Sequence, residues 1–487
     1  MLLEKLLAQT PGCEIPAYCS RLEIQSISCD SRQVLPNSVF VAILGPTANG
    51  ADFIPEAVRR GASVIVKTKD MPMNVPGEAV CVINVPDTKK FFRDLVRCFY
   101  GNPSSQVKTI AVTGTNGKTT ITYLLESIFK QAGKRCAVLG TVNHRIGDRT
   151  MESKNTTPGL LENQRFLGEM RDEGIEYCTM EVSSHALEQG RVDLIDFVAG
   201  IFTNLTGDHL DYHQTMENYF QAKAMLFETL HPGATAIINT DDPYGRRLVN
   251  MSRAKMILYG LSPHADVRAE NIRLDVEGSE FLFKSPDGWL TLRTNLIGLH
   301  NVYNILASSS AALSQGISLE VMAQGIEELR GVPGRLEKIP ADGNVHVYVD
   351  YAHTPDALNN VLRSLKKVSD ARTIVVFGCG GDRDRTKRPL MGRVASDLAE
   401  LSILTSDNPR SEDPQLIIEE IRRGFLRPHY KIIPDRREAI YEALNLAQPG
   451  DVVLIAGKGH ETYQIFKDQT IAFDDRQVVQ SYFACLD

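Results

Sequence analysis

The chain has 487 residues, which is enough for about three domains of ordinary size. Apolar residues make up 43% and charged residues 23% of it, the profile of a globular protein with a packed core. The net charge of −7 argues against a general affinity for nucleic acid, although it allows a local basic pocket for an anion. No apolar run approaches the roughly 18 residues of a membrane span, and the charged N-terminal stretch does not fit a signal peptide.

Nine cysteines are scattered along the chain, with no Cys-x-x-Cys pair among them. An odd number without paired spacing predicts neither a disulfide framework nor a structural zinc site. A reducing cytoplasm is therefore the expected compartment.

Three sections follow one another along the chain. The first, residues 1–105, has strand-like runs at 38–43 and 62–66 and a short helical pattern at 54–60. It closes on the polar turn at 101–105, which reads as a linker.

The second section, residues 106–333, alternates apolar runs with helical patterns. We expect strands at 109–113, 136–139, 177–182, 198–203 and 235–239, and a helix at 121–132. Such alternation predicts a parallel sheet with right-handed crossovers.

The third section, residues 334–487, predicts a smaller, Rossmann-like α/β unit. Its expected strands are 345–349, 373–377, 401–405, 431–433 and 452–456, and its expected helices include 355–367 and 389–400. The whole chain is thus predicted to be an α/β protein of three domains.

The sharpest local motif follows the buried run at 109–113 and opens the next helix: Gly114-Thr115-Asn116-Gly117-Lys118-Thr119-Thr120. A turn there directs backbone N–H groups and a helix N-terminus at a phosphate. Lys118 can reach the β- and γ-phosphates and the Thr119 hydroxyl can reach Mg²⁺. The match to the general P-loop is imperfect, because Val112 stands where its first glycine would fall. An ordinary strand–turn–helix is disfavoured, but the motif leaves kinase, switch GTPase, motor and ligase open.

Further motifs follow the phosphate loop in a fixed order. They are Asn155-Thr156-Thr157-Pro158, Met180-Glu181-Val182-Ser183-Ser184-His185, Gly207-Asp208-His209-Leu210-Asp211, Ala222-Lys223, Gly298-x-His300-Asn301-x-x-Asn304, Pro333-Gly334-Arg335-Leu336-Glu337, Asp350-Tyr351-Ala352-His353 and Asp407-Asn408-Pro409-Arg410. Together they resemble the Mur ligase family, across all three sections. The resemblance implies a uridine-nucleotide-binding N-terminal domain, a central ATP-binding domain and a C-terminal domain that binds an amino acid.

The resemblance also implies a catalytic centre in the second section. It makes Lys118, Lys223, Glu181 and His209 catalytic, with Thr119, Glu181 and His209 at Mg²⁺ and Lys223 carbamylated to N6-carboxylysine. A carboxylate after a buried strand suits Mg²⁺, which prefers oxygen ligands. By pattern alone, His209 reads as a structural histidine and Lys223 as a solvated lysine on a helix.

Substrate contacts are likewise implied by the resemblance. ATP is assigned to the phosphate loop 114–120 and to His300, Asn301, Asn304, Arg335, Asp350 and Tyr351. UDP-N-acetylmuramoyl-L-alanyl-D-glutamate is assigned to Ser31, Pro46, Thr47, Ala48, Asn155, Thr156, Thr157, Ser183, Gln189 and Arg191. Meso-2,6-diaminopimelate is assigned to Arg388, Asp407, Asn408, Pro409, Arg410, Gly457 and Glu461. For Gln189 and Arg191 the alternative is a surface helix end, and for Arg410 it is a surface ion pair with Glu412 or Asp413.

The expected reaction is the activation of a carboxylate by ATP, through an acyl phosphate, followed by attack of an amine. A monomer is expected, with no nucleic-acid partner. Folylpolyglutamate synthetase is a rival within the same superfamily, but it would not explain residues 407–410 or the N-terminal section. A nucleotide-dependent switch is a rival of another class, since it would hydrolyse the nucleotide without co-substrates.

Overall fold

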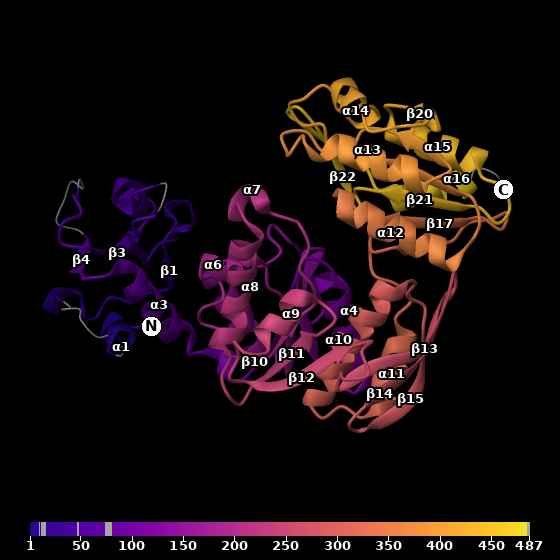
Figure 1. The fold of residues 1–487 in the computed structure, drawn as a ribbon. Coiled ribbons are helices and arrows are strands. Elements are labelled where there is room, and N and C mark those ends of the chain that lie inside the picture. Colours follow the sequence, from indigo (N-terminus) through magenta and orange to yellow (C-terminus); the bar gives the residue numbers. More distant parts are fainter. Residues whose placement is uncertain (9, 11–15, 46–47, 74–79, 485–487) are drawn as a thin grey trace. The chain divides into compact units, whose positions relative to one another are not determined.

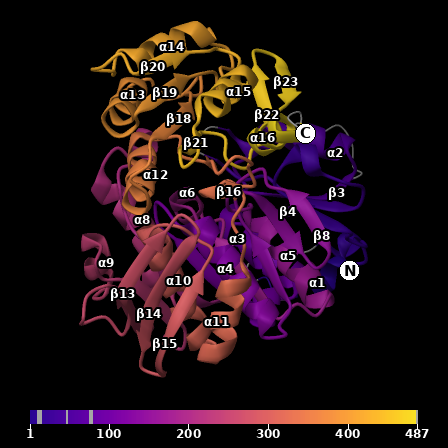
Figure 2. The ribbon, with the colours of Figure 1, turned by 90° about the vertical axis from the view of Figure 1, so that its right-hand side faces the viewer.

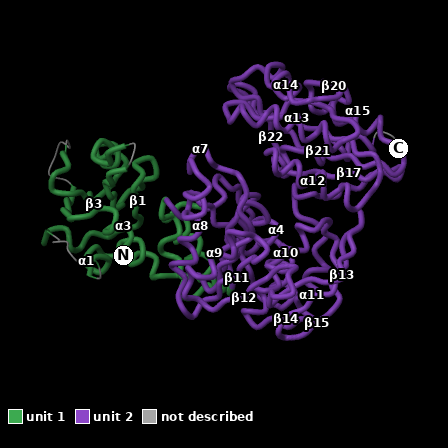
Figure 3. Tube along the Cα trace, viewed as in Figure 1, with its two compact units in different colours: residues 1–108, 158–176, 189–196 green, residues 109–157, 177–188, 197–487 purple. Residues whose placement is uncertain are grey.

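The computed structural model describes residues 1–8, 10, 16–45, 48–73 and 80–484. They divide into two compact units (Figure 3). Unit 1 comprises Met1–Lys108, Pro158–Glu176 and Gln189–Asp196, and unit 2 comprises Thr109–Thr157, Tyr177–Glu188 and Phe197–Asp487.

Unit 1 is built on a four-stranded parallel sheet, in the order β1-β2-β3-β4 (Figure 1). Its strands are β1 (Ser26–Ser28), β2 (Ser38–Val41), β3 (Ala62–Lys67) and β4 (Cys81–Asn84), and its helices are α1 (Leu3–Leu7), α2 (Ile54–Arg59), α3 (Thr88–Tyr100) and α5 (Leu160–Asp172). Successive side chains of a strand point to opposite faces of the sheet, and in β2 both sets are apolar. Val39 and Val41 pack with α1 and α3, whereas Phe40 packs with α2.

One feature of unit 1 differs from the expectation of no disulfide. Cys19 and Cys81 are joined, with their Cα atoms 6.0 Å apart. The two residues are 62 positions apart, so no local spacing announces the pair, and both lie in the apolar cluster under α1 and α3. Among the described residues this is a single bridge and not a framework.

The first part of unit 2 is an eleven-stranded sheet, in the order β15-β14-β13-β12-β11-β10-β5-β9-β6-β7-β8. The strands are β5 (Lys108–Thr113), β6 (Cys136–Leu139), β7 (Asn143–Ile146), β8 (Arg149–Glu152), β9 (Tyr177–Glu181), β10 (Phe197–Phe202), β11 (Thr235–Asn239), β12 (Lys255–Gly260), β13 (Val267–Asp275), β14 (Gly278–Ser285) and β15 (Gly288–Thr294). The predicted strands form its parallel middle, and the antiparallel strands at both edges were not predicted.

Helices cover this sheet. They are α4 (Lys118–Gln131), α6 (Ser184–Glu188), α7 (Leu210–His213), α8 (Met216–Thr229), α9 (Pro243–Leu248), α10 (Leu299–Ser314) and α11 (Leu319–Glu328). Helices α4, α10 and α11 share one apolar core with the sheet, and α10 and α11 lie against the strands β13–β15 (Figure 2). The phosphate loop directly follows β5, a central strand of the sheet that is buried from its second residue on.

The last part of unit 2 has a six-stranded sheet, in the order β16-β17-β21-β18-β19-β20, with only β16 antiparallel. The strands are β16 (Glu337–Ile339), β17 (His346–Asp350), β18 (Thr373–Phe377), β19 (Leu401–Leu404), β20 (Tyr430–Ile432) and β21 (Val452–Ala456), with a separate hairpin of β22 (Tyr463–Phe466) and β23 (Gln469–Ala472). One face packs on α12 (Pro355–Val368), α13 (Lys387–Leu398) and α14 (Pro414–Arg422), and the other on α15 (Arg436–Leu446) and α16 (Asp475–Ala484).

The carboxyl ends of β17, β18, β19 and β21 meet at one edge of this sheet, because these strands are parallel. Ligands of open α/β sheets bind at this edge. Asp350, the loop at 405–410 and the turn after Ala456 all lie there.

Candidate active site

The phosphate loop depends on two glycines in the left-handed region of backbone space. Gly114 has φ +142° and Gly117 has φ +92°. A Cβ on Gly114 would lie 1.9 Å from Thr203 Oγ1, and one on Gly117 would lie 2.3 Å from Asn304 Oδ1. Both positions therefore need glycine for conformation and for space. The close approach of Asn304 also places this residue of α10 beside the loop, as predicted for the ATP site.

Lys118 and Lys223 converge beneath the loop. Lys118 Nζ donates to the carbonyl oxygens of Gly114 and Thr115, both at 2.9 Å. Lys223 is 1% exposed, and its Nζ donates to the same Gly114 oxygen at 2.9 Å, beside the Tyr219 ring. Burial lowers the pKa of both ammonium groups, that of Lys223 well below its ordinary value, with Lys118 adding to the effect there.

Glu181 ends β9 and is 1% exposed. Its Oε1 accepts from Thr119 Oγ1 at 3.0 Å and from the Thr141 N–H at 2.8 Å, and its Oε2 accepts from Thr141 Oγ1 at 3.0 Å. Among the described residues it forms no ion pair. A buried carboxylate that is hydrogen-bonded but not neutralised by a side chain fits a cation, and hydroxyl and carboxylate oxygens are ligands that Mg²⁺ accepts.

His209 is the residue before α7, with φ +53°, and is half-exposed. Its Nε2 lies 3.5 Å from Asp208 Oδ2, and its ring contacts that of His185. Loss of hydration lowers its pKa, against the opposing charge of Asp208, and so favours the neutral imidazole that a metal needs. In the described part of the chain no three His, Cys, Asp or Glu side chains gather as a metal-binding group.

Residues before and after β17 reach the phosphate loop. Arg335 Nη2 donates to Thr119 Oγ1 at 3.1 Å, and its guanidinium lies over the Tyr351 ring. Asp350 is buried and accepts from the N–H groups of Leu336 and Ala352, at 2.6 and 2.8 Å. Burial raises the pKa of Asp350 to about 6. The predicted Arg335, Asp350 and Tyr351 are thus brought together next to Thr119.

The remaining predicted ATP residues lie at the start of α10. Asn301 donates to the Ile297 carbonyl at 2.9 Å, and Asn304 donates to Asn301 Oδ1 at 2.9 Å. His300 shares a hydrogen bond of 3.2 Å with Ser364 of α12. Asn304 approaches the loop at Gly117, and its hydrogen bond to Asn301 holds the two amides together.

The residues predicted for the uridine-linked dipeptide are divided between the units. In unit 1, the Ser31 hydroxyl donates to Glu56 Oε2 at 2.7 Å, and Arg191 donates to Gln189 Oε1. Ala48 also belongs to unit 1, whereas Pro46 and Thr47 lie outside the described residues.

In unit 2, the predicted dipeptide residues adjoin Glu181. Thr157 Oγ1 donates to the Glu181 carbonyl at 2.9 Å and accepts from the Ser183 N–H at 3.0 Å. The hydroxyls of Thr156 and Thr141 are hydrogen-bonded to each other at 3.1 Å, and Asn155 is exposed. A row of hydroxyls therefore continues from the carboxylate.

The residues predicted for the amino acid gather at the carboxyl edge of the C-terminal sheet. Arg410, with φ +53°, is fixed by backbone hydrogen bonds to Ile465 and Lys467, and its Nη1 donates to the Gly381 carbonyl at 2.8 Å. Among the described residues it has no ion pair with Glu412 or Asp413, so the surface-pair alternative is wrong. Glu461 receives a hydrogen bond of 2.9 Å from Asn408, and a Cβ on Gly457 would meet Asp407 Oδ2 at 2.6 Å.

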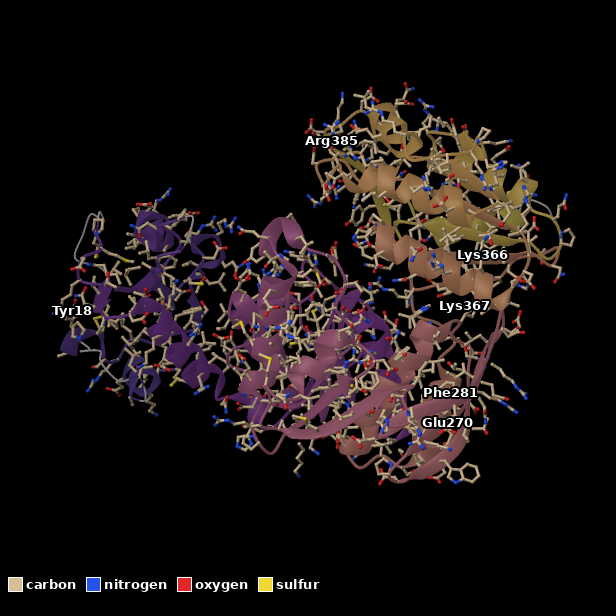
Figure 4. All side chains as sticks on the ribbon, in the orientation of Figure 1. Tyr18, Glu270, Phe281, Lys366, Lys367 and Arg385 are labelled. Atoms are coloured by element: carbon tan, nitrogen blue, oxygen red, sulfur yellow. A yellow bond between two sulfur atoms is a disulfide. The ribbon has the colours of Figure 1, made fainter. Side chains whose placement is uncertain are left out.

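Arg388 already has partners in the protein. Its side chain is fully buried, and it donates to both oxygens of Glu412, at 2.8 and 2.9 Å, and to Glu420 at 2.8 Å. Glu420 also pairs with Arg385, on the loop before α13 (Figure 4). An open pocket of about 620 Å³ adjoins Arg410 and Pro409 on the side of the β22–β23 turn, but neither Asn408 nor Glu461 lines it.

Comparisons with known proteins show the family of this chain. Family models match the Mur ligase family catalytic domain at 23–100, the Mur ligase middle domain at 112–312 and the Mur ligase glutamate ligase domain at 334–459. A relative from Geobacillus thermodenitrificans, UDP-N-acetylmuramoyl-L-alanyl-D-glutamate–2,6-diaminopimelate ligase, is 45% identical over 99% of each chain. The chain belongs to the Mur ligase family.

Solved structures give the same answer for this Mur ligase. One structure of a ligase of that same name has a TM-score of 0.72 and 36% identity, and covers 100% of this chain and 99% of its own. The MurF ligase of Thermotoga maritima, solved in complex with ADP, has a TM-score of 0.63 at 20% identity, covering 94% and 97%, and supports the fold. The three-domain α/β class predicted from sequence is thus confirmed. In the described residues no helix is long and apolar enough to cross a membrane.

Two residues of this site have no role in the predictions from sequence. Thr141 holds both oxygens of Glu181, and Lys458 is buried beside Glu461. Tyr219, one helical turn before Lys223, lies against the Lys223 ammonium. Thr141 and Lys458 follow strands β6 and β21, and the only available signal was their position at carboxyl strand ends.

Proposed function

We propose that this Mur ligase adds meso-2,6-diaminopimelate to the D-glutamate carboxylate of UDP-N-acetylmuramoyl-L-alanyl-D-glutamate, with hydrolysis of ATP to ADP and phosphate. The observation that carries the proposal is the 45% identity, over 99% of both chains, to a ligase of that name. The reaction is a step of peptidoglycan precursor synthesis, and so serves cell shape and cell division. We further propose a monomer in the cytoplasm, with domains at 1–105, 106–333 and 334–487.

ATP binding is assigned to the phosphate loop and the residues around it. The N-terminus of α4 has no capping side chain and would face a phosphate of the nucleotide, and Lys118 supplies a positive charge next to it. Arg335, which lies 3.1 Å from Thr119, adds a guanidinium that binds phosphate oxygens. His300, Asn301 and Asn304 are assigned to the nucleoside.

Mg²⁺ is assigned to Thr119, Glu181 and His209. Glu181 fits this role, because it is buried and has hydrogen bonds but forms no ion pair among the described residues. The ion, when bound, would offset the negative charge that gathers between the attacking carboxylate and the γ-phosphate.

Lys223 is proposed to carry a carbamate. Carbamylation requires a neutral amine, and burial beside Lys118 lowers the pKa of Lys223 well below its ordinary value. The product is an anion, which would be attracted to the Lys118 ammonium and not repelled by it. The same pocket therefore disfavours an ammonium at Lys223 and favours a carbamate there.

The acyl step needs the acceptor carboxylate near the γ-phosphate. Thr156, Thr157 and Ser183 form a row of hydroxyls that starts at Glu181, and we assign the dipeptide end of the substrate to them. Ser31, Pro46, Thr47, Ala48, Asn155, Gln189 and Arg191 are assigned to the same substrate. The carboxylate attacks the γ-phosphorus, ADP leaves, and the amine of the amino acid then displaces phosphate from the acyl phosphate.

The amino acid is assigned to the edge formed by Asp407, Asn408, Pro409, Arg410, Gly457 and Glu461, together with Arg388. Diaminopimelate differs from lysine by a carboxylate on its distal carbon, and the Arg410 guanidinium suits that group. Glu461 is suited to an ammonium. Arg388 contributes by holding Glu412 away from Arg410.

A screen of amino acids tests the proposal. Phosphate release from ATP should require both UDP-N-acetylmuramoyl-L-alanyl-D-glutamate and meso-diaminopimelate, with Mg²⁺ present. Release with nucleotide alone would favour a switch, and release with a folate and glutamate would favour the folylpolyglutamate rival. Either outcome would overturn the assignment.

A further inference from the structure

Lys458 is a lysine with no exposed surface at the carboxyl edge of the C-terminal sheet. It follows β21 and Gly457, and its side chain is 0% exposed. Its Nζ donates to Glu461 Oε2 at 3.0 Å and to Asn408 Oδ1 at 3.2 Å, and it lies over the Tyr463 ring. Burial of an unpaired ammonium lowers the stability of the fold, so Lys458 needs the hydrogen bonds from its Nζ to Glu461 and Asn408.

The contacts of Asn408 fix the orientation of its side-chain amide. Its Oδ1 accepts from Lys458 and from the Ile465 N–H at 3.1 Å, and its Nδ2 donates to Glu461 Oε2 at 2.9 Å. The reversed amide would set N–H groups against two donors, which excludes it. Lys458, Asn408 and Glu461 therefore form a closed triangle with one consistent set of donors and acceptors.

The triangle treats the two oxygens of Glu461 differently. Oε2 receives hydrogen bonds from both Lys458 and Asn408. In the described part of the chain no donor is found for Oε1, although the Glu461 side chain is only 18% exposed. One oxygen is thus held by the protein, and the other is left for an external donor.

We propose that Lys458 is a positioning residue for the incoming amino acid. It holds Asn408 and Oε2 of Glu461, so that Oε1 faces the ammonium of the amino acid. The inference rests on the proposed function, because it assumes that Glu461 receives this group. A competing effect has the opposite sign: the Lys458 charge weakens the attraction of Glu461 for a second ammonium. The effect of Lys458 on the orientation of Glu461 is larger than this loss of attraction. Without the hydrogen bonds from Lys458 and Asn408, the Glu461 carboxylate would turn toward other partners.

The test compares Michaelis constants in the full-length enzyme. Lys458→Met keeps the length of the buried stem and removes the ammonium. We expect the KM for meso-diaminopimelate to rise by about tenfold or more, with the KM values for ATP and for the UDP-dipeptide within about twofold of wild type. A merely structural lysine would lower the amount of active enzyme and leave all three KM values alone. An unchanged or lowered KM for the amino acid overturns the proposal.

A second pair of variants keeps the test decisive if Lys458→Met fails to fold. Glu461→Gln is compared with the double variant Lys458→Met/Glu461→Gln, which buries neither charge. Because Lys458 acts through Glu461, the two should share one KM for meso-diaminopimelate within about twofold. A further rise in the double variant would overturn the proposal.

Lys366→Met is the matched control. Lys366 pairs with Glu400 at 3.0 Å, the same separation as in the Lys458 pair, but on the exposed surface of α12 (Figure 4). It should leave every KM unchanged. If wild-type enzyme itself shows no phosphate release that depends on the amino acid, the proposed function has failed, and that result is distinct from a working enzyme that is indifferent to Lys458.

Discussion

Lys118 and Lys223 donate to one and the same acceptor, the carbonyl oxygen of Gly114, each at 2.9 Å. Two ammonium groups this close repel one another, and the repulsion joins burial in lowering the pKa of Lys223. Conversion of one of them to an anion would turn repulsion into attraction. The geometry of the phosphate loop and the chemistry of the carbamate are therefore linked through a single carbonyl group.

Lys118→Ala should abolish turnover with little loss of fold. Lys118 lies at the start of α4 on the phosphate loop, outside the apolar core, so its removal leaves no large cavity. We expect kcat to fall by about 10²-fold or more, as for the loss of a charge that stabilises a transition state. Steady-state kinetics and a thermal melt of the purified variant check this. Near-normal kinetics would mean that the loop does not bind the transferred phosphate.

Lys223 should carry a carbamate in the active enzyme. Incubation with ¹³C-labelled bicarbonate is expected to give a carbamate carbon signal in the wild type that is absent from Lys223→Ala. That variant should be nearly inactive, and formate or acetate should restore part of its activity by filling the anionic position. The control is Lys338→Ala, which removes a lysine paired with Glu277 at the surface. A bare amine at Lys223 in the Mg²⁺- and nucleotide-bound enzyme would exclude the modification.

Gly117→Ala should raise the KM for ATP. The new Cβ would lie 2.3 Å from Asn304 Oδ1, so either the loop or Asn304 must move. Gly133→Ala is a matched control at the other end of α4, since Gly133 also has a positive φ, +70°, but no atom within 4 Å of its Cβ. Both variants should lose about 1–2 kcal/mol of stability from the left-handed backbone. An equal effect of the two on the KM would show that crowding at Asn304 is irrelevant.

Much of the fold could be predicted because buried parallel strands are continuous apolar runs. Cys136–Leu139, Thr235–Asn239, Thr373–Phe377 and Val452–Ala456 have the predicted bounds. The strand β13 was missed, because much of it is solvated on one face and reads Val-Arg-Ala-Glu-Asn-Ile-Arg-Leu-Asp. Its pairing with β14 is set by tertiary contacts and not by its own apolar content.

The site shows the same division. Gly117, Lys118 and Glu181 could be predicted, since the first two closely follow the buried strand β5 and Glu181 is the last residue of the buried strand β9. The Cys19–Cys81 bridge and the contact of Lys458 with Asn408 could not, because 62 and 50 residues separate the partners. Such contacts depend on which strands become neighbours in the folded sheet, and no local sequence pattern predicts that.

Acid should weaken the pair of Arg388 and Glu412. Hydrogen bonds from the Arg388 guanidinium lower the pKa of Glu412 from its ordinary 4.5 to about 2. Because the folded pKa lies below the unfolded one, the pair contributes stability above pH 4.5 and loses it as the pH falls toward 2. The difference in Tm between wild type and Glu412→Gln should therefore stay constant from about pH 7 to about pH 5 and narrow as the pH falls from about 5 to about 3. A Tm difference that stays constant down to about pH 3 would show that ionisation of Glu412 does not contribute to stability. The control is Glu442→Gln, which changes the exposed pair of Glu442 with Lys431.

The choice of amino acid should depend on Arg410. Glu412 is held by Arg388 and forms no ion pair with Arg410 among the described residues. The Arg410 side chain donates from Nη1 to the carbonyl oxygens of Gly381 and Asn408. Its backbone is fixed against Ile465 and Lys467, so the guanidinium is directed before the substrate arrives. A site built for the distal carboxylate of diaminopimelate leaves this cation unpaired when L-lysine binds. Discrimination should then reach the order of 10⁴-fold.

A competition assay with equal L-lysine and meso-diaminopimelate measures that preference. Wild type should incorporate diaminopimelate almost exclusively, and Arg410→Ala should lose most of the preference, chiefly through a higher KM for diaminopimelate. Arg437→Ala, which removes an exposed arginine from the first turn of α15, should keep the wild-type ratio. Comparable incorporation of lysine by the wild type would refute the assigned substrate. An unchanged ratio in Arg410→Ala would not refute the assigned substrate, but it would show that another residue recognises the distal carboxylate.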